Sequence, residues 1–336
     1  MVNTYQYKYA FRFKVMWQLS KKIMLFIFIL FLVSCKNDPP HTLRIAINPW
    51  PGYEVLHLAK EKGFFKQAGL NVELIRVASL ADTQRVYLNN KVDGLTSTLI
   101  EAIQIQSFAV RPLTIALITD YSLGGDAIIA HKSIANMAAL KGKTVGTEVS
   151  SLGIYVLQRG LQKHKLSLND VTIKNVEQMS GIKEMNKGEI SAYVTYPPIS
   201  TELLKNPNYH VIFDSGQIPK EVVDIVSISQ SYLKKHPETL EKLWQVWQLS
   251  YEFIQTHPDE AMTKMAKLEG LDIDEFAKAF SGLEMQTGDA QSELINHQFL
   301  KNVTKQVCET LWSIKSIDEP CGFVSSMFFN QLKQNK

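Results

Sequence analysis

The sequence predicts an α/β protein in which parallel sheets are covered by helices. From about residue 43 onward, short β-branched or apolar runs alternate with amphipathic stretches, and the loops between them are short. This alternation is typical of strand–helix–strand units with parallel strands. About 295 residues follow the N-terminal leader, which is enough for two modest lobes with a substantial core.

In the first half of the chain, strands are predicted wherever β-branched and apolar residues cluster. We expect strands at 43–47, 71–77, 92–95 and 113–118, with helices at 55–62, 81–89 and 98–107 between them. Gly63 directly follows the first helix. Because glycine readily adopts a left-handed backbone, Gly63 is expected to end that helix.

The second half first repeats this alternation and then becomes helical. We expect strands at 143–146, 171–173, 192–194, 209–213 and 222–228, and helices at 151–164, 182–187 and 199–205. Further helices are expected at 237–255, 258–268, 273–281 and 292–311.

The N-terminus is typical of an export signal. Five basic residues and no acidic residue precede an apolar run at 23–33, which is too short to cross a bilayer. The run ends in Leu-Val-Ser-Cys35, which looks like a bacterial lipobox. We therefore expect a signal peptide at 1–34, cleavage before Cys35 and a lipid on its thiol. The alternative is a free Cys beside a signal anchor, and translation can begin at Met1 or Met16.

Removing the signal peptide changes the net charge. The chain has 36 Lys and Arg against 33 Asp and Glu, and five of the basic residues precede Cys35, so the remainder carries 31 against 33, or −2. A nearly neutral domain argues against a nucleic-acid partner. In an oxidising envelope, Cys308 and Cys321 can form a disulfide, and two free thiols are the alternative.

No residue pattern indicates an enzyme or a metalloprotein. The eight histidines lack the spacing of zinc ligands, and the chain has neither a phosphate-binding glycine-rich loop nor a nucleophile elbow. We expect no catalytic residue, no metal and no cofactor.

Candidate ligand-binding residues follow the predicted strands, because ligands of open α/β sheets bind beyond the carboxyl ends of the strands. The first strand is followed by Trp50 and Tyr53, which can present flat faces to a ligand or simply pack. Thr96, Ser97 and Thr98 follow the third strand. Their hydroxyls can bind a polar group or cap the next helix.

The remaining candidates are polar residues in later loops. They are Asp120, Tyr121 and Asp126 at the first predicted crossing between lobes, Glu148, Ser150 and Ser151 before a helix, and Tyr196 after a late strand. The glycines at 124 and 125 also fit a plain turn. Ser150 and Ser151 also fit helix caps.

Several segments, in this order, resemble the solute-binding proteins of ABC importers. The closest group is the one associated with nitrate, sulfonates, taurine and thiamine-pyrimidine precursors. The resemblance rests on Asn48-Pro49-Trp50-Pro51-Gly52-Tyr53, on residues 58–65 and 69–73, on 92–99, and on 120–126 and 140–146. It runs from about Leu43 to Val226. The group often has Trp-Glu-Pro where this chain has Tyr196-Pro197-Pro198.

The resemblance implies a type II periplasmic-binding-protein fold, in which two lobes close on a small molecule and deliver it to a permease. Together with the strand pattern, it gives a tether at 35–42, a discontinuous lobe I at 43–123 and 224–330, and a lobe II at 124–223. It implies that the cleft uses Trp50, Thr96, Ser97, Asp120, Tyr121, Glu148, Ser150 and Tyr196.

The candidate loops contain Glu54, Asp120, Asp126 and Glu148 but no Lys or Arg. Small anions usually recruit Arg or several helix N-termini, so we expect an amine-bearing or neutral heteroaromatic ligand. The protein is expected to be a monomer anchored in the cell envelope by its lipid. A sensory or scaffold lipoprotein is an alternative. Enzymes of this fold, such as a thiamine-pyrimidine synthase, work in the cytoplasm, and the export signal argues against them.

Overall fold

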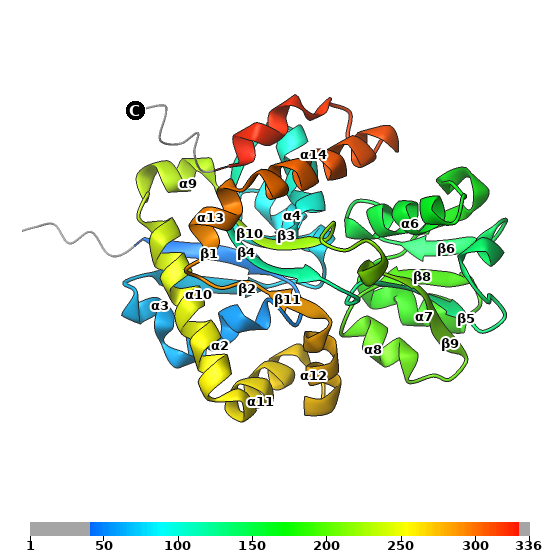
Figure 1. Cartoon of the computed structure of the whole chain (residues 1–336), viewed down its shortest axis with the longest axis horizontal. Helices are drawn as coiled ribbons and strands as arrows, with labels where there is room; N and C mark the ends of the chain where they lie inside the picture. Colours follow the sequence, from blue (N-terminus) through cyan, green and yellow to red (C-terminus); the bar gives the residue numbers. More distant parts are fainter. Residues whose placement is uncertain (1–40, 329–336) are drawn as a thin grey trace, which may run out of the picture. The chain divides into compact units, whose positions relative to one another are not determined.

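The computed structural model describes residues 41–328, which form two sheets covered by helices. The predicted signal peptide and Cys35 lie outside the described residues. Within residues 41–328, no helix is both long and apolar enough to cross a membrane. Figure 1 shows the six-stranded sheet on the left and the five-stranded sheet on the right.

The six-stranded sheet has the strand order β11-β4-β10-β3-β1-β2. Strands β1, β2 and β3 run parallel, whereas β10 is antiparallel to both β3 and β4. The bounds are β1 Thr42–Ile47, β2 Asn71–Arg76, β3 Gly94–Thr98, β4 Leu113–Ser122, β10 Val223–Ser229 and β11 Leu283–Met285. We call this sheet with its helices lobe I.

The five-stranded sheet has the order β7-β6-β8-β5-β9, and β5 is antiparallel to β8 and β9. The bounds are β5 Ala127–His131, β6 Thr144–Thr147, β7 Thr172–Asn175, β8 Ala192–Thr195 and β9 Tyr209–Asp214. We call this sheet with its helices lobe II. The expectation of parallel sheets holds only in part, because β10 and β5 each enter from the other lobe and run against their neighbours, and β11 is antiparallel to β4.

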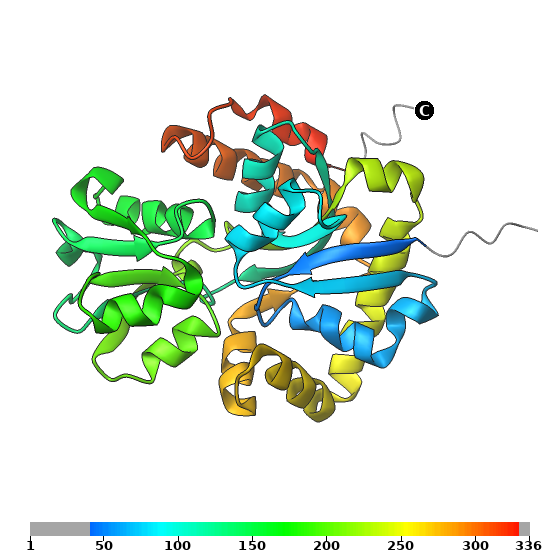
Figure 2. The same cartoon turned by 180° about the vertical axis from the view of Figure 1, so that it is seen from behind.

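Helices cover both faces of each sheet. In Figures 1 and 2, α4 and α5 lie on one side of the lobe I sheet and α2 and α11 on the other. The lobe I helices are α2 Glu54–Lys62, α3 Phe64–Gln67, α4 Leu80–Leu88, α5 Leu99–Ser107, α9 Gln230–Lys235, α10 Thr239–Thr256, α11 Pro258–Glu269, α12 Ile273–Ser281, α13 Gln291–Asn296 and α14 Gln298–Ser313. The lobe II helices are α6 Leu152–Lys163, α7 Gly181–Asn186 and α8 Ile199–Leu204.

Gly63 ends α2 in the left-handed conformation, as predicted from its position. The single helix predicted at 292–311 was wrong. His297 has an extended backbone between α13 and α14, and its Nδ1 accepts a hydrogen bond from the Phe299 amide, so it caps α14. Strands β5 and β11 were not predicted at all.

Two segments connect the lobes, after β4 and after β9. They meet where the Ser122 and Ser215 hydroxyls lie 2.7 Å apart, and Ser215 Oγ also accepts from the Gly124 amide at 2.7 Å. Strand β4 ends at Ser122 and β10 begins at Val223. The crossings are therefore short segments tied by side-chain hydrogen bonds.

A disulfide joins Cys308 on α14 to Cys321, with the two Cα atoms 5.9 Å apart. It attaches the segment after α14 to that helix. Helix α14 in turn packs on α5, which begins directly beside the junction of the lobes.

Candidate ligand-binding site

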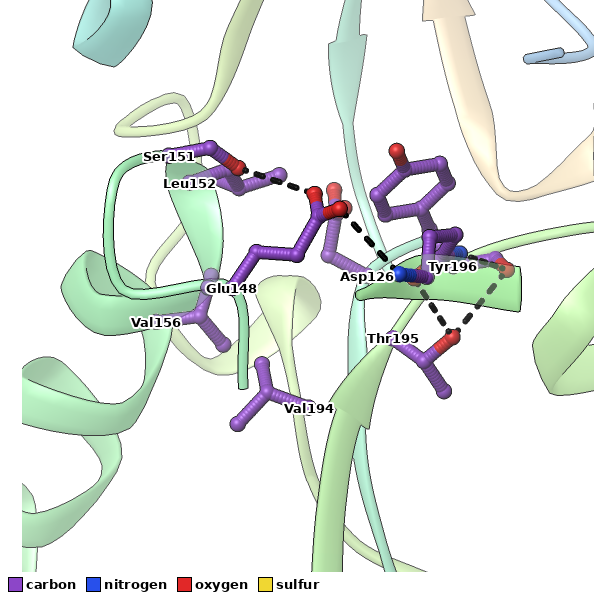
Figure 3. Close-up of a pocket in the computed structure, with 10 residues that line it drawn as sticks. Asp126, Glu148, Ser151, Leu152, Val156, Val194, Thr195 and Tyr196 are labelled. Carbon is purple, nitrogen blue, oxygen red and sulfur yellow. Dashed lines mark hydrogen bonds between the residues drawn. The ribbon is translucent and has the colours of Figure 1, made fainter. Parts of the chain in front are cut away.

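A small cavity lies in lobe II, facing the junction of the lobes. Its walls come from the residue before β5, the turn between β6 and α6, Gln178 and the end of β8. Its volume is about 10 Å³, which is room for about one water molecule. In Figure 3, Glu148, Asp126 and Tyr196 surround this space, with Val156 and Val194 below them. No Lys or Arg lines it.

Glu148 is held by hydrogen bonds within lobe II. Its Oε1 accepts from the Gln178 amide at 3.1 Å, and its Oε2 from the Ser151 hydroxyl at 3.5 Å (Figure 3). Burial raises the pKa of this carboxyl, and the Gln178 amide opposes the shift. Glu148 therefore lines the cavity with its carboxylate held in a fixed position.

Asp126 is the least satisfied polar residue of the cavity. Its side chain is buried, with 2% exposed, and neither carboxylate oxygen has a hydrogen-bond partner among the described residues. Burial raises its pKa to about 7. A buried carboxylate without a partner raises the free energy of the folded protein. Asp126 is therefore stabilised either by binding a proton or by accepting a hydrogen bond from a ligand.

Asp120 and Asp224 face each other across neighbouring antiparallel strands, β4 and β10. Both are buried, and like charges in this arrangement repel. Asp120 accepts from the Thr119 hydroxyl at 2.9 Å and from Trp50 Nε1 at 3.4 Å. Burial raises the pKa of Asp120 to about 7 and that of Asp224 well above its ordinary value. At least one of the two holds a proton near neutral pH.

The Tyr53 hydroxyl connects this pair to β3. It lies 2.9 Å from the Ser97 carbonyl oxygen and 2.6 Å from Asp224 Oδ1. A phenol has one proton, and a carbonyl oxygen can only accept. Both contacts are hydrogen bonds at once only if Asp224 is protonated and donates to Tyr53.

Glu101 spans the junction of the lobes. It lies in the first turn of α5, where its Oε2 accepts from the Thr98 amide at 2.7 Å and the Thr98 hydroxyl at 2.6 Å. Its Oε1 accepts from the Leu152 amide at 2.6 Å, at the first residue of α6 in lobe II. A carboxylate of lobe I thus occupies a helix N-terminus of lobe II, where an anion would otherwise bind.

Two further hydrogen bonds cross the junction from α4. The Leu80 amide donates to the Tyr196 hydroxyl at 3.2 Å, and Gln84 Nε2 donates to the Ser150 carbonyl at 2.7 Å. Together with the hydrogen bond between Glu101 and the Leu152 amide, they hold the two lobes together beside the cavity.

Trp50 packs between the candidate side chains. It is 3% exposed, and its ring centre lies 6.0 Å from that of Tyr196 in an edge-on arrangement. A Cβ on Gly125 would lie 2.6 Å from Trp50 Cη2, so the indole requires glycine there. In this arrangement of the lobes, the indole stabilises the junction.

Most of the predicted candidates gather at this junction. Trp50, Tyr53, Asp120, Asp126, Glu148, Ser151 and Tyr196 are buried around it. Ser97 is buried beside them, and its hydroxyl has no partner among the described residues. Thr96 donates to Asn48 Oδ1 at 3.0 Å and so supports the Trp50 loop.

Three candidates lie elsewhere. Tyr121 points to the opposite side of β4 from Asp120, because side chains alternate along a strand, and it packs on Phe299. Thr98 is the N-cap of α5 and is engaged with Glu101. Ser150 is exposed and offers only its carbonyl to the junction.

Sequence reasoning missed Glu101, Asp224 and Gln178. Thr98 and Glu101 have the spacing of a capping box, which could have identified Glu101. An aspartate inside the apolar run 222–228 could have singled out Asp224. No local signal indicated Gln178, whose side chain bonds to Thr195 and Tyr196. Among residues 41–328, no group of three His, Cys, Asp or Glu could hold a metal ion.

Two α/β lobes joined by two crossings, with buried polar groups at the junction, define the periplasmic-binding-protein fold. The structure matches the alkanesulfonate-binding protein SsuA from Xanthomonas axonopodis pv. citri with a TM-score of 0.72 and 14% identity, over 83% of this chain and 95% of that one. It matches SsuA from Escherichia coli with a TM-score of 0.73 and 14% identity, over 88% and 100%. The predicted fold class is confirmed.

Residues 50–261 match the family model described as NMT1/THI5 like, and the chain belongs to this family. It is 24% identical over 257 residues to the putative binding protein YtlA of Bacillus subtilis, covering 74% of this chain and 77% of that protein. It is 22% identical over 255 residues to the formylaminopyrimidine-binding protein of Halalkalibacterium halodurans, covering 72% and 77%. The predicted resemblance is confirmed.

Proposed function

We propose that this protein is an extracytoplasmic solute-binding protein that captures a small amine-bearing molecule between its lobes and delivers it to an ABC importer. Its fold, its family and the relatives described as binding proteins support a binding role over an enzymatic one. The predicted lipid on Cys35 would keep it at the membrane beside the permease.

Asp126 carries the proposal for the ligand. A carboxylate that is buried, lines a cavity and lacks a partner needs a hydrogen-bond donor. An ammonium group offers three N–H donors and an opposite charge, so it compensates the cost of burial. The cavity is about the size of one such group.

The surrounding charges argue against a small anion. Asp120, Asp126, Glu148 and Glu101 are all buried near the junction, and no Lys or Arg lines the cavity. The amide at the start of α6, which could bind a sulfonate or nitrate oxygen, already donates to Glu101. In this closed arrangement, an anion would therefore meet acidic side chains and no free amide at this helix.

An organic ligand needs more room than the cavity offers in this arrangement. We infer that it enters when the lobes separate about the Ser122–Ser215 crossing and the three hydrogen bonds from α4 and α5 to lobe II break. Opening would also expose the faces of Trp50 and Tyr196. An aromatic ring with an aminoalkyl group could then stack on them while its ammonium group binds Asp126.

Thermal-shift measurements on the purified protein test the proposal. Aminopyrimidines and simple amines are expected to raise the melting temperature, whereas nitrate and alkanesulfonates are not. Native mass spectrometry of unrefolded protein would identify a retained ligand and show whether Cys35 begins the mature chain. Stabilisation by nitrate or a sulfonate, without any by amines, would contradict the ligand class.

A further inference from the structure

Three carboxyl groups lie together at the junction without a basic partner. We call Asp120, Asp126 and Asp224 the cleft carboxyls. No hydrogen bond or ion pair found for them within residues 41–328 involves Lys, Arg or His. Burial, and then the charges of Asp120 and Glu101, raise the pKa values of Asp126 and Asp224, and the Ser122 and Tyr53 hydroxyls oppose the rise. Tyr53 also contacts them, and Glu148 lines the same cavity as Asp126.

Proton counting indicates that these carboxyls are not all ionised in the ligand-free protein. The Tyr53 hydroxyl can donate to only one of its two acceptors, so Asp224 must supply the second proton. Asp120 faces Asp224 across the strand pair, where two negative charges would repel. Among residues 41–328 no cation contacts Asp126 and neither of its carboxylate oxygens has a hydrogen-bond partner, and the nearby Ser122 hydroxyl only partly opposes the effect of burial on its pKa.

An ammonium group of a ligand bound at Asp126 would change which form of this carboxyl, protonated or ionised, is the more stable. It supplies the positive charge and the donors that the carboxyl lacks, so the ionised form becomes the stable one. The carboxyl O–H bond then breaks, its proton passes to solvent, and the carboxylate accepts an N–H hydrogen bond. The net charge of the site is unchanged, because one proton leaves as one cation enters.

We propose that the cleft exchanges a proton for a cation: the ligand-free cleft carboxyls hold protons, and binding of an ammonium group releases one from Asp126. This inference rests on the proposed function, because it requires a cationic ligand. It adds that capture depends on pH, being strong in neutral or alkaline surroundings and weak in acid.

How strongly the affinity for the ligand depends on pH follows from the pKa of Asp126. Burial raises its pKa to about 7. For one exchanged proton, affinity is nearly constant above that pH and falls about tenfold for each pH unit below it. Binding at pH 5.5 should therefore be roughly 30-fold weaker than at pH 8.

The first measurement needs no ligand. Carbon-13 NMR of the aspartate carboxyls follows each group through a pH titration of the whole protein. Asp126→Asn assigns its resonance, and Asp274→Asn, an exposed position, is the matched control. We expect the Asp126 carboxyl to titrate between about pH 6 and 8. Full ionisation of all three cleft carboxyls at pH 5.5 would overturn the proposal.

The second measurement uses methylammonium chloride as the probe, because its charged end is about the size of the cavity. Added to weakly buffered protein at pH 6.5, it should release protons that an indicator dye detects. Asp126→Asn should release none. Glu269→Gln, which removes a buried carboxyl away from the cavity, should release as many as the unaltered protein.

The outcomes separate the two proposals. Methylammonium binding that releases no proton and is equally tight at pH 5.5 and 8 contradicts the exchange and leaves the amine site standing. Absence of amine binding at every pH contradicts the proposed function and the exchange with it. Proton release that persists in Asp126→Asn assigns the exchange to another group and so overturns it.

Discussion

The protein has two clusters of buried acidic side chains, one at the junction of the lobes and one within lobe I. They differ in what surrounds them. The cleft carboxyls have no basic partner, and Asp126 opens onto a cavity. The second group is Glu54 at the start of α2 with Glu269 at the end of α11, 0% and 4% exposed. Arg76 Nη2 lies 3.5 Å from Glu54 Oε1, and neither glutamate lines the cavity.

Burial raises the pKa in both groups, to about 7 for Glu54 and well above the ordinary value for Glu269. Glu54 lies in the first turn of its helix, where the helix dipole favours a negative charge, and Glu269 lies in a last turn, where it does not. Glu269 therefore keeps a proton, because burial and the nearby charge of Glu54 both oppose its ionisation. A raised pKa thus marks burial, whereas a binding site also needs a cavity, which Asp126 lines and the two glutamates do not.

The largest effect is expected from Asp126→Asn, which should weaken amine binding by about 100-fold or more, since a buried charge pair is lost. The amide keeps the shape of the side chain. Isothermal titration with the aminopyrimidine or amine that gives the largest thermal shift measures the change, and Asp274→Asn should bind normally. Unchanged affinity in Asp126→Asn would move the binding site away from this cavity.

Asp120→Asn should stabilise the ligand-free protein at alkaline pH. The folded-state pKa of Asp120 is raised to about 7, so the folded protein holds more protons than the unfolded chain between about pH 4 and 7. Stability is therefore lost as pH rises through that window, and an amide avoids the loss. Urea unfolding at pH 8 should show a gain of roughly 2–4 kcal/mol.

At pH 4 the same variant should gain little, since Asp120 is protonated in the folded protein and about half protonated in the unfolded chain. Equal gains at pH 4 and pH 8 would show that packing, and not ionisation, is responsible.

Glu269→Gln should separate stability from binding. Removing one carboxyl of the Glu54–Glu269 pair leaves a neutral donor for Glu54, so unfolding free energy at pH 8 should rise by roughly 1–3 kcal/mol. Amine affinity should stay within about twofold, since the pair does not line the cavity. A large loss of affinity would mean that the two acidic groups act as one site.

The smallest effect is expected from Tyr196→Phe, which removes the hydrogen bond from the Leu80 amide and keeps the ring. One such bond contributes about 1 kcal/mol, so affinity should fall about fivefold. Small-angle scattering of the ligand-free protein should show a more open average form. If Tyr196→Phe leaves both measurements unchanged, that bond does not contribute to closing the lobes.

The helices and strands of this protein were largely predictable because their signals are local. Gly63 ends α2 as expected, and the strand of residues 192–195 agrees with its short apolar run. The break at His297 escaped prediction because the apolar pattern continues through it. Strand β5 was missed because it follows directly on a glycine turn in which Asp126 indicated a loop.

The sequence predicted which loops contribute to the candidate site. It did not predict how their side chains are placed relative to one another. Asp120 and Tyr121 are neighbours in the sequence, yet strand alternation sends one to the junction and the other to Phe299. Glu101 and Leu152 are far apart in sequence, and only the packing of the lobes brings them within 2.6 Å.

The sequence by itself determined the family, the alternation of strands and helices, and a set of binding loops rich in carboxylates and without Lys or Arg. These follow from residue type and local spacing. Only the tertiary structure decided that Asp120 faces Asp224, that Glu101 occupies the start of α6 and that Asp126 is left without a partner. The physical reason is that burial and partnership, which set the charge of a carboxyl, depend on contacts between distant parts of the chain.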